Sequence, residues 1–155
     1  MKLWLALALL INNAWAQTLC GPQEVVHFSC MVKHQKTASL CASSDKTQLQ
    51  YRFGTKTKIE LSYPTELKDS PKKFFYAQYS RFQTNYEKIN FKNDGVEYEL
   101  NDRYEGKRSY SLRIVLKDGK EVLLPCLKHM TSEMTPLKTI VSCDPDDALN
   151  MGQCK

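Results

Sequence analysis

The chain has 155 residues, of which 42% are hydrophobic and 25% charged, and its formal net charge is +5. These fractions are those of an ordinary globular domain, so they argue against a disordered chain or a fibrous repeat, and the length fits one domain. The only long apolar run lies at the N-terminus, which excludes a membrane protein with several spans.

Residues 1–16 have the features of a secretory signal peptide. Lys2 precedes nine apolar residues at 3–11, and the small residues Ala14 and Ala16 predict cleavage before Gln17. Nine apolar residues are too few for a transmembrane helix, which needs about twenty. We therefore expect an exported chain without stable membrane insertion, located in the periplasm or secreted.

The predicted mature chain, residues 17–155, forms a single β domain in this interpretation. It keeps 21 basic and 17 acidic residues, so its formal charge is +4. Leu19 stands where a lipobox requires a small residue before its cysteine, which argues against a lipid anchor on Cys20.

Apolar and polar residues alternate with period two in short segments from residue 25 to residue 126. The clearest are 25–31, 37–43, 48–53, 58–63, 88–92, 96–101, 110–116 and 122–124. Such alternation is typical of antiparallel strands with one buried face, and turn-forming residues separate the segments at 54–56, 93–95 and 118–119. The pattern predicts an all-β fold of about eight or nine strands, arranged as a single antiparallel barrel or sandwich.

Residues 74–86 contain six aromatic side chains on both parities, which predicts a strand with rings on both faces. Basic residues are interleaved with these rings, and such a face can stack on bases or sugars. A central core strand explains the same residues more simply. The charge of +4 is weak for a nucleic-acid-binding protein, so we expect no nucleic-acid partner.

The C-terminal segment differs in character. Residues 128–139 are polar and show no alternation. Asp144, Pro145 and the acidic residues that follow resemble the start of a helix, which predicts a short helix at about 145–151 that ends before Gly152. The acids lack the spacing of a calcium loop, so helix capping is the preferred interpretation.

Six cysteines remain after the predicted cleavage, and an even number in an exported chain predicts three disulfides. Cys30 and Cys41 lie in two strand-like segments joined by a polar turn, which suggests that they pair across a hairpin. Cys143 and Cys154 could close a second small loop and leave Cys20 and Cys126 for each other. Spacing alone leaves the pairing of these last four cysteines open.

Recognisable catalytic and metal-binding motifs are missing from the sequence. It has no G-x-S-x-G, no H-E-x-x-H, no Gly-rich phosphate loop and no C-x-x-C. Disulfide formation also removes the thiolates that a zinc site would need. We therefore expect no catalytic residues, no metal and no cofactor.

Two stretches together carry a specific resemblance. Phe28-Ser29-Cys30 is followed by Ser39-Leu40-Cys41, and the string Leu49-Gln50-Tyr51-Arg52-Phe53-Gly54 is followed by Lys58-Ile59-Glu60-Leu61. Residues 28–64 therefore resemble a group of small exported proteins of Gram-negative bacteria that carry the same string. The resemblance implies an all-β exported domain and no particular activity.

The β-hairpin around Gly54 is also similar to a motif of the periplasmic inhibitors of C-type lysozyme, which are small exported β-barrels. Those inhibitors carry Y-x-x-x-T-K-G, with a lysine directed toward the lysozyme cleft. Tyr51, Thr55 and Lys56 match this motif, whereas Thr57 replaces the glycine and a second motif, S-G-x-x-Y, has no counterpart. The resemblance implies a binding site of Tyr51, Thr55 and Lys56, and Lys58 projects from the same predicted turn.

These observations predict an exported, non-catalytic binding module of the bacterial envelope. Its partner would be a protein or another envelope component, with a lysozyme-type hydrolase as the most concrete candidate. Two alternatives remain open. One is an envelope hydrolase without a recognisable motif, which a cleft holding two carboxylates such as Asp102 and Glu105 would favour. The other is a structural envelope protein, which a long exposed apolar edge would favour.

Overall fold

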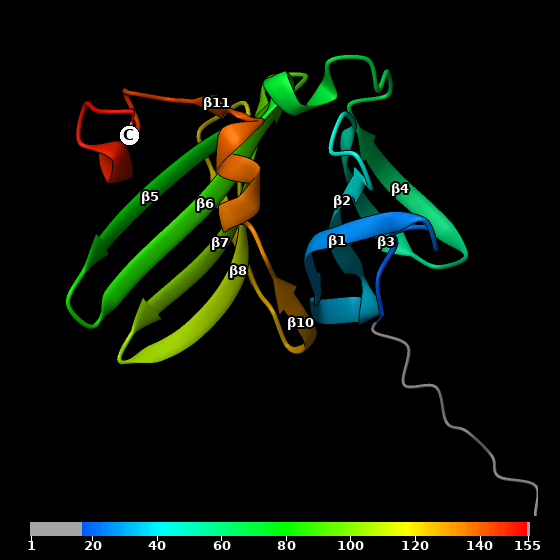
Figure 1. The fold of residues 1–155 in the computed structure, drawn as a ribbon. Helices are drawn as coiled ribbons and strands as arrows, with labels where there is room; N and C mark the ends of the chain where they lie inside the picture. The colour runs from blue at the N-terminus through cyan, green and yellow to red at the C-terminus, as the bar shows by residue number, and fades with distance from the viewer. Residues whose placement is uncertain (1–16, 155) are drawn as a thin grey trace, which may run out of the picture.

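A computed structural model describes residues 17–154 of the chain. The predicted signal peptide, residues 1–16, and its cleavage site lie at or outside the edge of the described residues. Within the described part, the chain forms eleven strands in two sheets and no α-helix (Figure 1). The all-β prediction is therefore confirmed.

The smaller sheet has the strand order β10-β1-β2-β3-β4, and every neighbouring pair is antiparallel. Its strands are β1 (Glu24–Met31), β2 (Thr37–Ser43), β3 (Leu49–Thr55), β4 (Lys58–Tyr63) and β10 (Lys128–Ser132).

The larger sheet has the order β11-β5-β6-β7-β8-β9. Its strands are β5 (Phe75–Arg81), β6 (Thr84–Asn93), β7 (Val96–Glu105), β8 (Lys107–Val115), β9 (Glu121–Pro125) and β11 (Ser142–Cys143). All pairs are antiparallel except β11 with β5, which is parallel. The long hairpins β5–β6 and β7–β8 project away from the smaller sheet, at the lower left of Figure 1.

Short 3₁₀ helices complete the described residues. They are η1 (Lys33–Gln35), η2 (Ser70–Lys73), η3 (Thr135–Thr139) and η4 (Ala148–Asn150). The two sheets do not close on each other, so the arrangement fits a sandwich, and the barrel alternative is not confirmed.

The core lies between the two sheets and is dominated by aromatic side chains. Phe91 of β6 stacks on Tyr63 at a ring-centroid distance of 4.5 Å and on Tyr98 at 4.9 Å. Tyr51 and Phe74 pack against the same ring at 5.0 and 5.4 Å. The rings that lie in strands alternate with outward residues, which is the pattern that the sequence showed, and Phe74 directly precedes β5.

The segment 74–86 is a hairpin rather than one strand. Chain reversal occurs at Phe82 and Gln83, between β5 and β6, and Gln83 takes a positive φ of 57°. The turn contains none of the Gly, Asn or Asp residues that mark such turns in a sequence. The prediction of a single strand is therefore wrong, although β5 by itself carries rings on both faces, with Tyr76 buried and Phe75 exposed.

The C-terminal predictions need two further corrections. The polar segment 128–139, for which the sequence showed no strand pattern, contains β10, which pairs with β1. The helix predicted at about 145–151 is not confirmed, because the described residues there form only the 3₁₀ turn η4. Its cap is Asp147, whose side chain accepts a hydrogen bond from the backbone N–H of Leu149.

The three disulfides join Cys20 to Cys41, Cys30 to Cys126 and Cys143 to Cys154. The predicted Cys143–Cys154 bond is confirmed, and the Cys30–Cys41 and Cys20–Cys126 pairings are wrong. The register of β1 and β2 gives the reason. Cys30 lies opposite Ala38 and points into the core, whereas Cys41 lies opposite Val26 on the other face.

Candidate functional site

The tip of the β3–β4 hairpin carries three of the four residues that the sequence proposed for binding. Lys56 and Lys58 are exposed at its tip, and Thr55 is partly exposed beside them. Tyr51 lies apart from this group, because it is only 1% exposed and packs among the core rings. Burial, with a smaller contribution from Tyr98, raises the pKa of its hydroxyl well above the usual range.

Local backbone geometry explains why this hairpin needs Gly54. The pairing of β3 with β4 shifts register between Phe53 and Gly54, and Gly54 has a φ of 145°. A Cβ at this position would lie 2.3 Å from the carbonyl oxygen of Lys58. The turn itself falls at Lys56 and Thr57, so it overlaps the turn predicted at 54–56 only at Lys56. Beside it, the Oγ1 of Thr55 accepts a hydrogen bond of 3.2 Å from the backbone N–H of Lys58.

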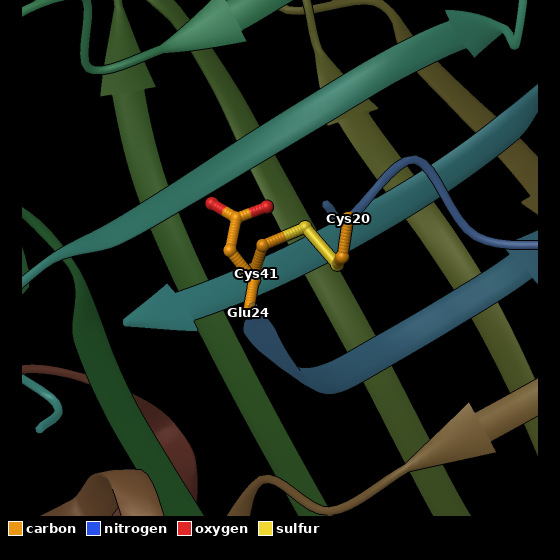
Figure 2. A group of neighbouring side chains, drawn as sticks. All are labelled: Cys20, Glu24 and Cys41. Carbon is orange, nitrogen blue, oxygen red and sulfur yellow. A yellow bond between two sulfur atoms is a disulfide. The ribbon is translucent and has the colours of Figure 1, made fainter. Parts of the chain in front are cut away.

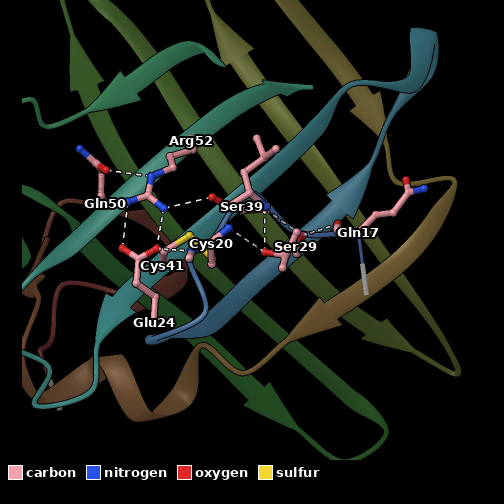
Figure 3. Close-up of a disulfide and its surroundings, with 11 residues drawn as sticks. Gln17, Cys20, Glu24, Ser29, Ser39, Cys41, Gln50 and Arg52 are labelled. Carbon is pink, nitrogen blue, oxygen red and sulfur yellow. Dashed lines mark hydrogen bonds and ion pairs between the residues drawn. A yellow bond between two sulfur atoms is a disulfide. The ribbon is translucent and has the colours of Figure 1, made fainter. Parts of the chain in front are cut away.

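The N-terminal arm, residues 17–22, covers the outer face of the smaller sheet. The Cys20–Cys41 disulfide attaches the arm to β2 (Figure 3). The Oγ of Ser39 accepts a hydrogen bond from the backbone N–H of Leu19, and the Oγ of Ser29 donates one to the carbonyl oxygen of Gln17. Because of this cover, Ser39 and Cys41 are buried although they point away from the core.

Arg52 connects the arm to the hairpin that bears the lysines. Its guanidinium donates to both carboxylate oxygens of Glu24, at 2.5 and 2.8 Å, and to the carbonyl oxygen of Leu19 at 3.0 Å. A bidentate contact of this kind fixes both distance and orientation. Burial raises the pKa of Glu24, but hydrogen bonds from Arg52 and Gly21 outweigh this effect, so the pKa lies below its usual value.

Figure 2 shows Cys20, Glu24 and Cys41 together, a grouping that resembles a metal site by residue type. Both sulfur atoms form one disulfide, so neither is available as a thiolate ligand. The cluster is therefore structural, and the Glu24 carboxylate is the ion-pair partner of Arg52.

An open hollow of about 530 Å³ lies between the arm and the hairpin tip. Its walls are Lys56, Ile59 and arm residues 18–22. Ile59 is 43% exposed, so the hollow offers an apolar patch next to a lysine ammonium group. A partner could place an acidic group against Lys56 and an apolar side chain against Ile59 in this hollow.

The carboxylates named for the hydrolase alternative do not form a pair. Asp102 is buried and receives two hydrogen bonds from Arg108, at 2.8 and 2.9 Å. Glu105 is three residues further along β7, so it points to the opposite face of the sheet, where it accepts a bond from Tyr86.

Sequence reasoning missed a different carboxylate, Glu87, which lies directly opposite Asp102 in the register of β6 and β7. Glu87 is buried and accepts hydrogen bonds from the hydroxyls of Tyr76 and Thr135. The proximity of these two acids follows from the strand register, which cannot be read from the sequence alone.

Of the three acids Asp144, Asp146 and Asp147, which lack the spacing of a calcium loop, the side chains of Asp144 and Asp147 have structural partners. Asp144 accepts the backbone N–H of Asp146, and Asp147 caps η4 and forms an ion pair of 2.5 Å with Lys88. His27 is buried, with its Nδ1 at 2.7 Å from the carbonyl oxygen of Glu133, and burial lowers its pKa.

Among residues 17–154, no helix has the length and apolar character that crossing a membrane requires. The three disulfides are typical of an oxidising, extracellular or periplasmic setting. No family model, curated protein or solved structure matches this chain.

Proposed function

We propose that the chain is an exported, non-catalytic binding protein of the bacterial envelope, and that its binding element is the tip of the β3–β4 hairpin. The observation that carries this proposal is a pair of exposed lysines, Lys56 and Lys58, on a hairpin that Arg52 and the N-terminal arm hold in place. A braced hairpin loses little backbone entropy on binding, so the main entropic cost is the ordering of the lysine side chains themselves.

The most concrete partner is a lysozyme-type hydrolase. A cleft built around two carboxylates would accept the ammonium group of Lys56 through charge-assisted hydrogen bonds, which are the stronger kind. Ile59 and the arm would supply the apolar contact beside it. The charge of +4 predicted for the mature chain slows its approach to a basic lysozyme, so this binding would depend on close contacts rather than on long-range attraction.

An inhibition assay against C-, G- and I-type lysozymes tests the proposal. We expect inhibition of at least one class at micromolar concentration, and at least a tenfold loss of inhibition in Lys56→Ala. Lys68→Ala is the matched control, because Lys68 is also an exposed lysine, on the loop after β4. Both variants should keep the thermal midpoint of the wild type.

Two results would overturn the proposal. The first is the absence of inhibition of every lysozyme class by the wild type. The second is an equal loss in Lys56→Ala and Lys68→Ala, which would assign the effect to overall charge. A hydrolase activity on wall polymers would favour the alternative function instead, and substitution of Glu87 or Asp102 would then be the first experiment on its origin.

A further inference from the structure

The outer face of the larger sheet has an open region near the ends of its two long hairpins. The strand register places Tyr79, Tyr86 and Arg103 in one row across β5, β6 and β7. The row nearer the tips contains Arg81, Glu105 and Lys107 on the same face. We call these six residues the distal face.

The C-terminal loop covers the neighbouring part of this sheet but not the distal face. The side chain of Asn150 accepts a hydrogen bond from the backbone N–H of Gln78 and donates one to the carbonyl oxygen of Tyr76, both in β5. Asp147 forms an ion pair with Lys88 of β6. The distal face lies beyond these contacts, toward the free ends of the hairpins (Figure 1). Its cations are all exposed.

The basic residues beneath the C-terminal loop and those of the distal face differ in ion pairing. Under and beside the C-terminal loop, Lys88 pairs with Glu99 and Asp147, and Arg113 pairs with Glu99 and Glu121. In the described part of the chain, by contrast, Arg81, Arg103 and Lys107 take part in no ion pair. The one acid of the distal face, Glu105, is held by the hydroxyl of Tyr86 at 2.7 Å. The bond from a neutral hydroxyl leaves Glu105 its negative charge, so three cations and one carboxylate give the distal face a formal charge of +2.

Its aromatic and cationic groups form a continuous row, in which Arg103 lies over the Tyr86 ring and the Tyr79 ring is tilted against Tyr86. The guanidinium of Arg103 lies 4.3 Å from the centroid of the Tyr86 ring, and the Tyr86 and Tyr79 rings are 6.3 Å apart. The row crosses three strands, so it spans on the order of 10 Å. Stacking restrains the guanidinium before any ligand arrives and leaves its N–H donors free for a planar acid.

A hollow of about 290 Å³ adjoins this row. Tyr86, Asn101 and Arg103 contribute to its lining, and Leu149 of the C-terminal loop forms part of its wall. The rest of the lining is Glu87 and the ion-paired group of Lys88, Glu99 and Arg113. This volume is near the lower end of the range of about 300–1,000 Å³ that is usual for small-molecule sites. A single ring with polar substituents suits it better than an extended apolar ligand.

We propose that the distal face binds an acidic polysaccharide. The sugar rings stack along the row that Tyr79 begins, and the carboxylates accept hydrogen bonds from Arg103, Arg81 and Lys107. Unneutralised cations next to aromatic rings and an amide fit this chemistry. A lipid surface fits less well, because Phe82, at 89% exposed, is the one fully exposed large apolar side chain at these tips.

This site is separate from the β3–β4 hairpin and does not depend on the function proposed for Lys56. Isothermal titration calorimetry of the disulfide-bonded chain at 50 mM salt tests it, with a hexamer of galacturonic acid as the probe and a neutral glucose hexamer as the control. We expect the acidic hexamer to bind and the neutral one not to bind.

Variants then locate the site. Arg103→Gln should weaken binding of the acidic hexamer at least tenfold. Arg103→Lys keeps the charge but loses the planar guanidinium, and it should weaken binding at least threefold. Lys68→Gln and Lys56→Ala should bind within twofold of the wild type. If Arg103→Gln does not fold, the double variant Arg81→Gln/Lys107→Gln should show the same tenfold loss.

Three results would overturn the proposal. They are no binding of the acidic hexamer by the wild type, an equal loss in Arg103→Gln and Lys68→Gln, and wild-type affinity in Arg103→Lys. Binding to vesicles containing phosphatidylglycerol without binding to the acidic hexamer would also overturn it, in favour of a lipid surface.

Discussion

Removal of the Cys30–Cys126 disulfide should destabilise the protein more than removal of either of the others. This bond joins β1 of the smaller sheet to the chain just after β9 of the larger one, across a separation of 96 residues. The separations of the other two bonds are 21 and 11 residues. Loop-closure entropy then predicts losses of about 4.7, 3.3 and 2.8 kcal/mol for the three bonds in that order.

Urea denaturation, followed by far-ultraviolet circular dichroism, measures these losses in three double Cys→Ala variants. The variant that lacks Cys143 and Cys154 is the internal control, because its bond lies at the exposed C-terminal loop and closes the shortest loop. Cys30 is also buried in the core, so its substitution adds a packing loss in the same direction. An equal or smaller loss for Cys30→Ala/Cys126→Ala than for the control would refute the reasoning.

Two further predictions concern the arm and the core. Glu24→Gln should lower the free energy of unfolding by roughly 1–3 kcal/mol at pH 7, because it breaks a charge-assisted contact with Arg52. Folding lowers the pKa of Glu24 below 4.5, so its contribution to stability is present above that pH and is lost as the pH falls through the folded pKa. The free energies of unfolding of wild type and variant should therefore converge at low pH. A constant difference between them from pH 7 to pH 3 would contradict this. Phe91→Ala should cost about 3–5 kcal/mol and abolish most of the near-ultraviolet circular dichroism, because it removes the ring between Tyr63 and Tyr98. A retained near-ultraviolet spectrum would show that these tyrosines keep their order without it.

The strands could be predicted because their signal is local. Alternation located β1 to β4 and most of β6 to β9, since each inward residue meets the core and each outward one meets water or a cover. The hairpin at Phe82 was missed because its turn residues are atypical and both of its strands are rich in rings. The strand β10 was missed because it is an edge strand with largely exposed, polar residues.

The disulfides could not be paired from spacing, because pairing depends on the face to which each cysteine points. Two residues in neighbouring strands can be close along the ladder and still lie on opposite sides of the sheet, as Cys30 and Cys41 do. The irregular register between Val26 and Phe28 adds to this difficulty, because a bulge changes the facing of everything beyond it.

The candidate site was predictable only in part. Turn chemistry identified the exposed hairpin tip, and alternation could have placed Tyr51 in the core with Leu49 and Phe53. The contacts that brace the tip join Arg52 to Leu19 and Glu24, which are distant in sequence and carry no motif. The row of Tyr79, Tyr86 and Arg103 likewise exists only through the register of three strands.

The order of the cysteines along the chain has a consequence for biosynthesis. Cys30 lies between Cys20 and Cys41, so the loop that those two close contains a cysteine whose own partner comes much later. A chain that enters an oxidising compartment N-terminus first exposes three thiols long before Cys126 arrives. Oxidation of neighbours in order of emergence would join Cys20 to Cys30 and leave Cys41 without its native partner. On that route, maturation would require thiol–disulfide exchange, by an isomerase or by slow reshuffling, and the yield in a host would follow the supply of that activity.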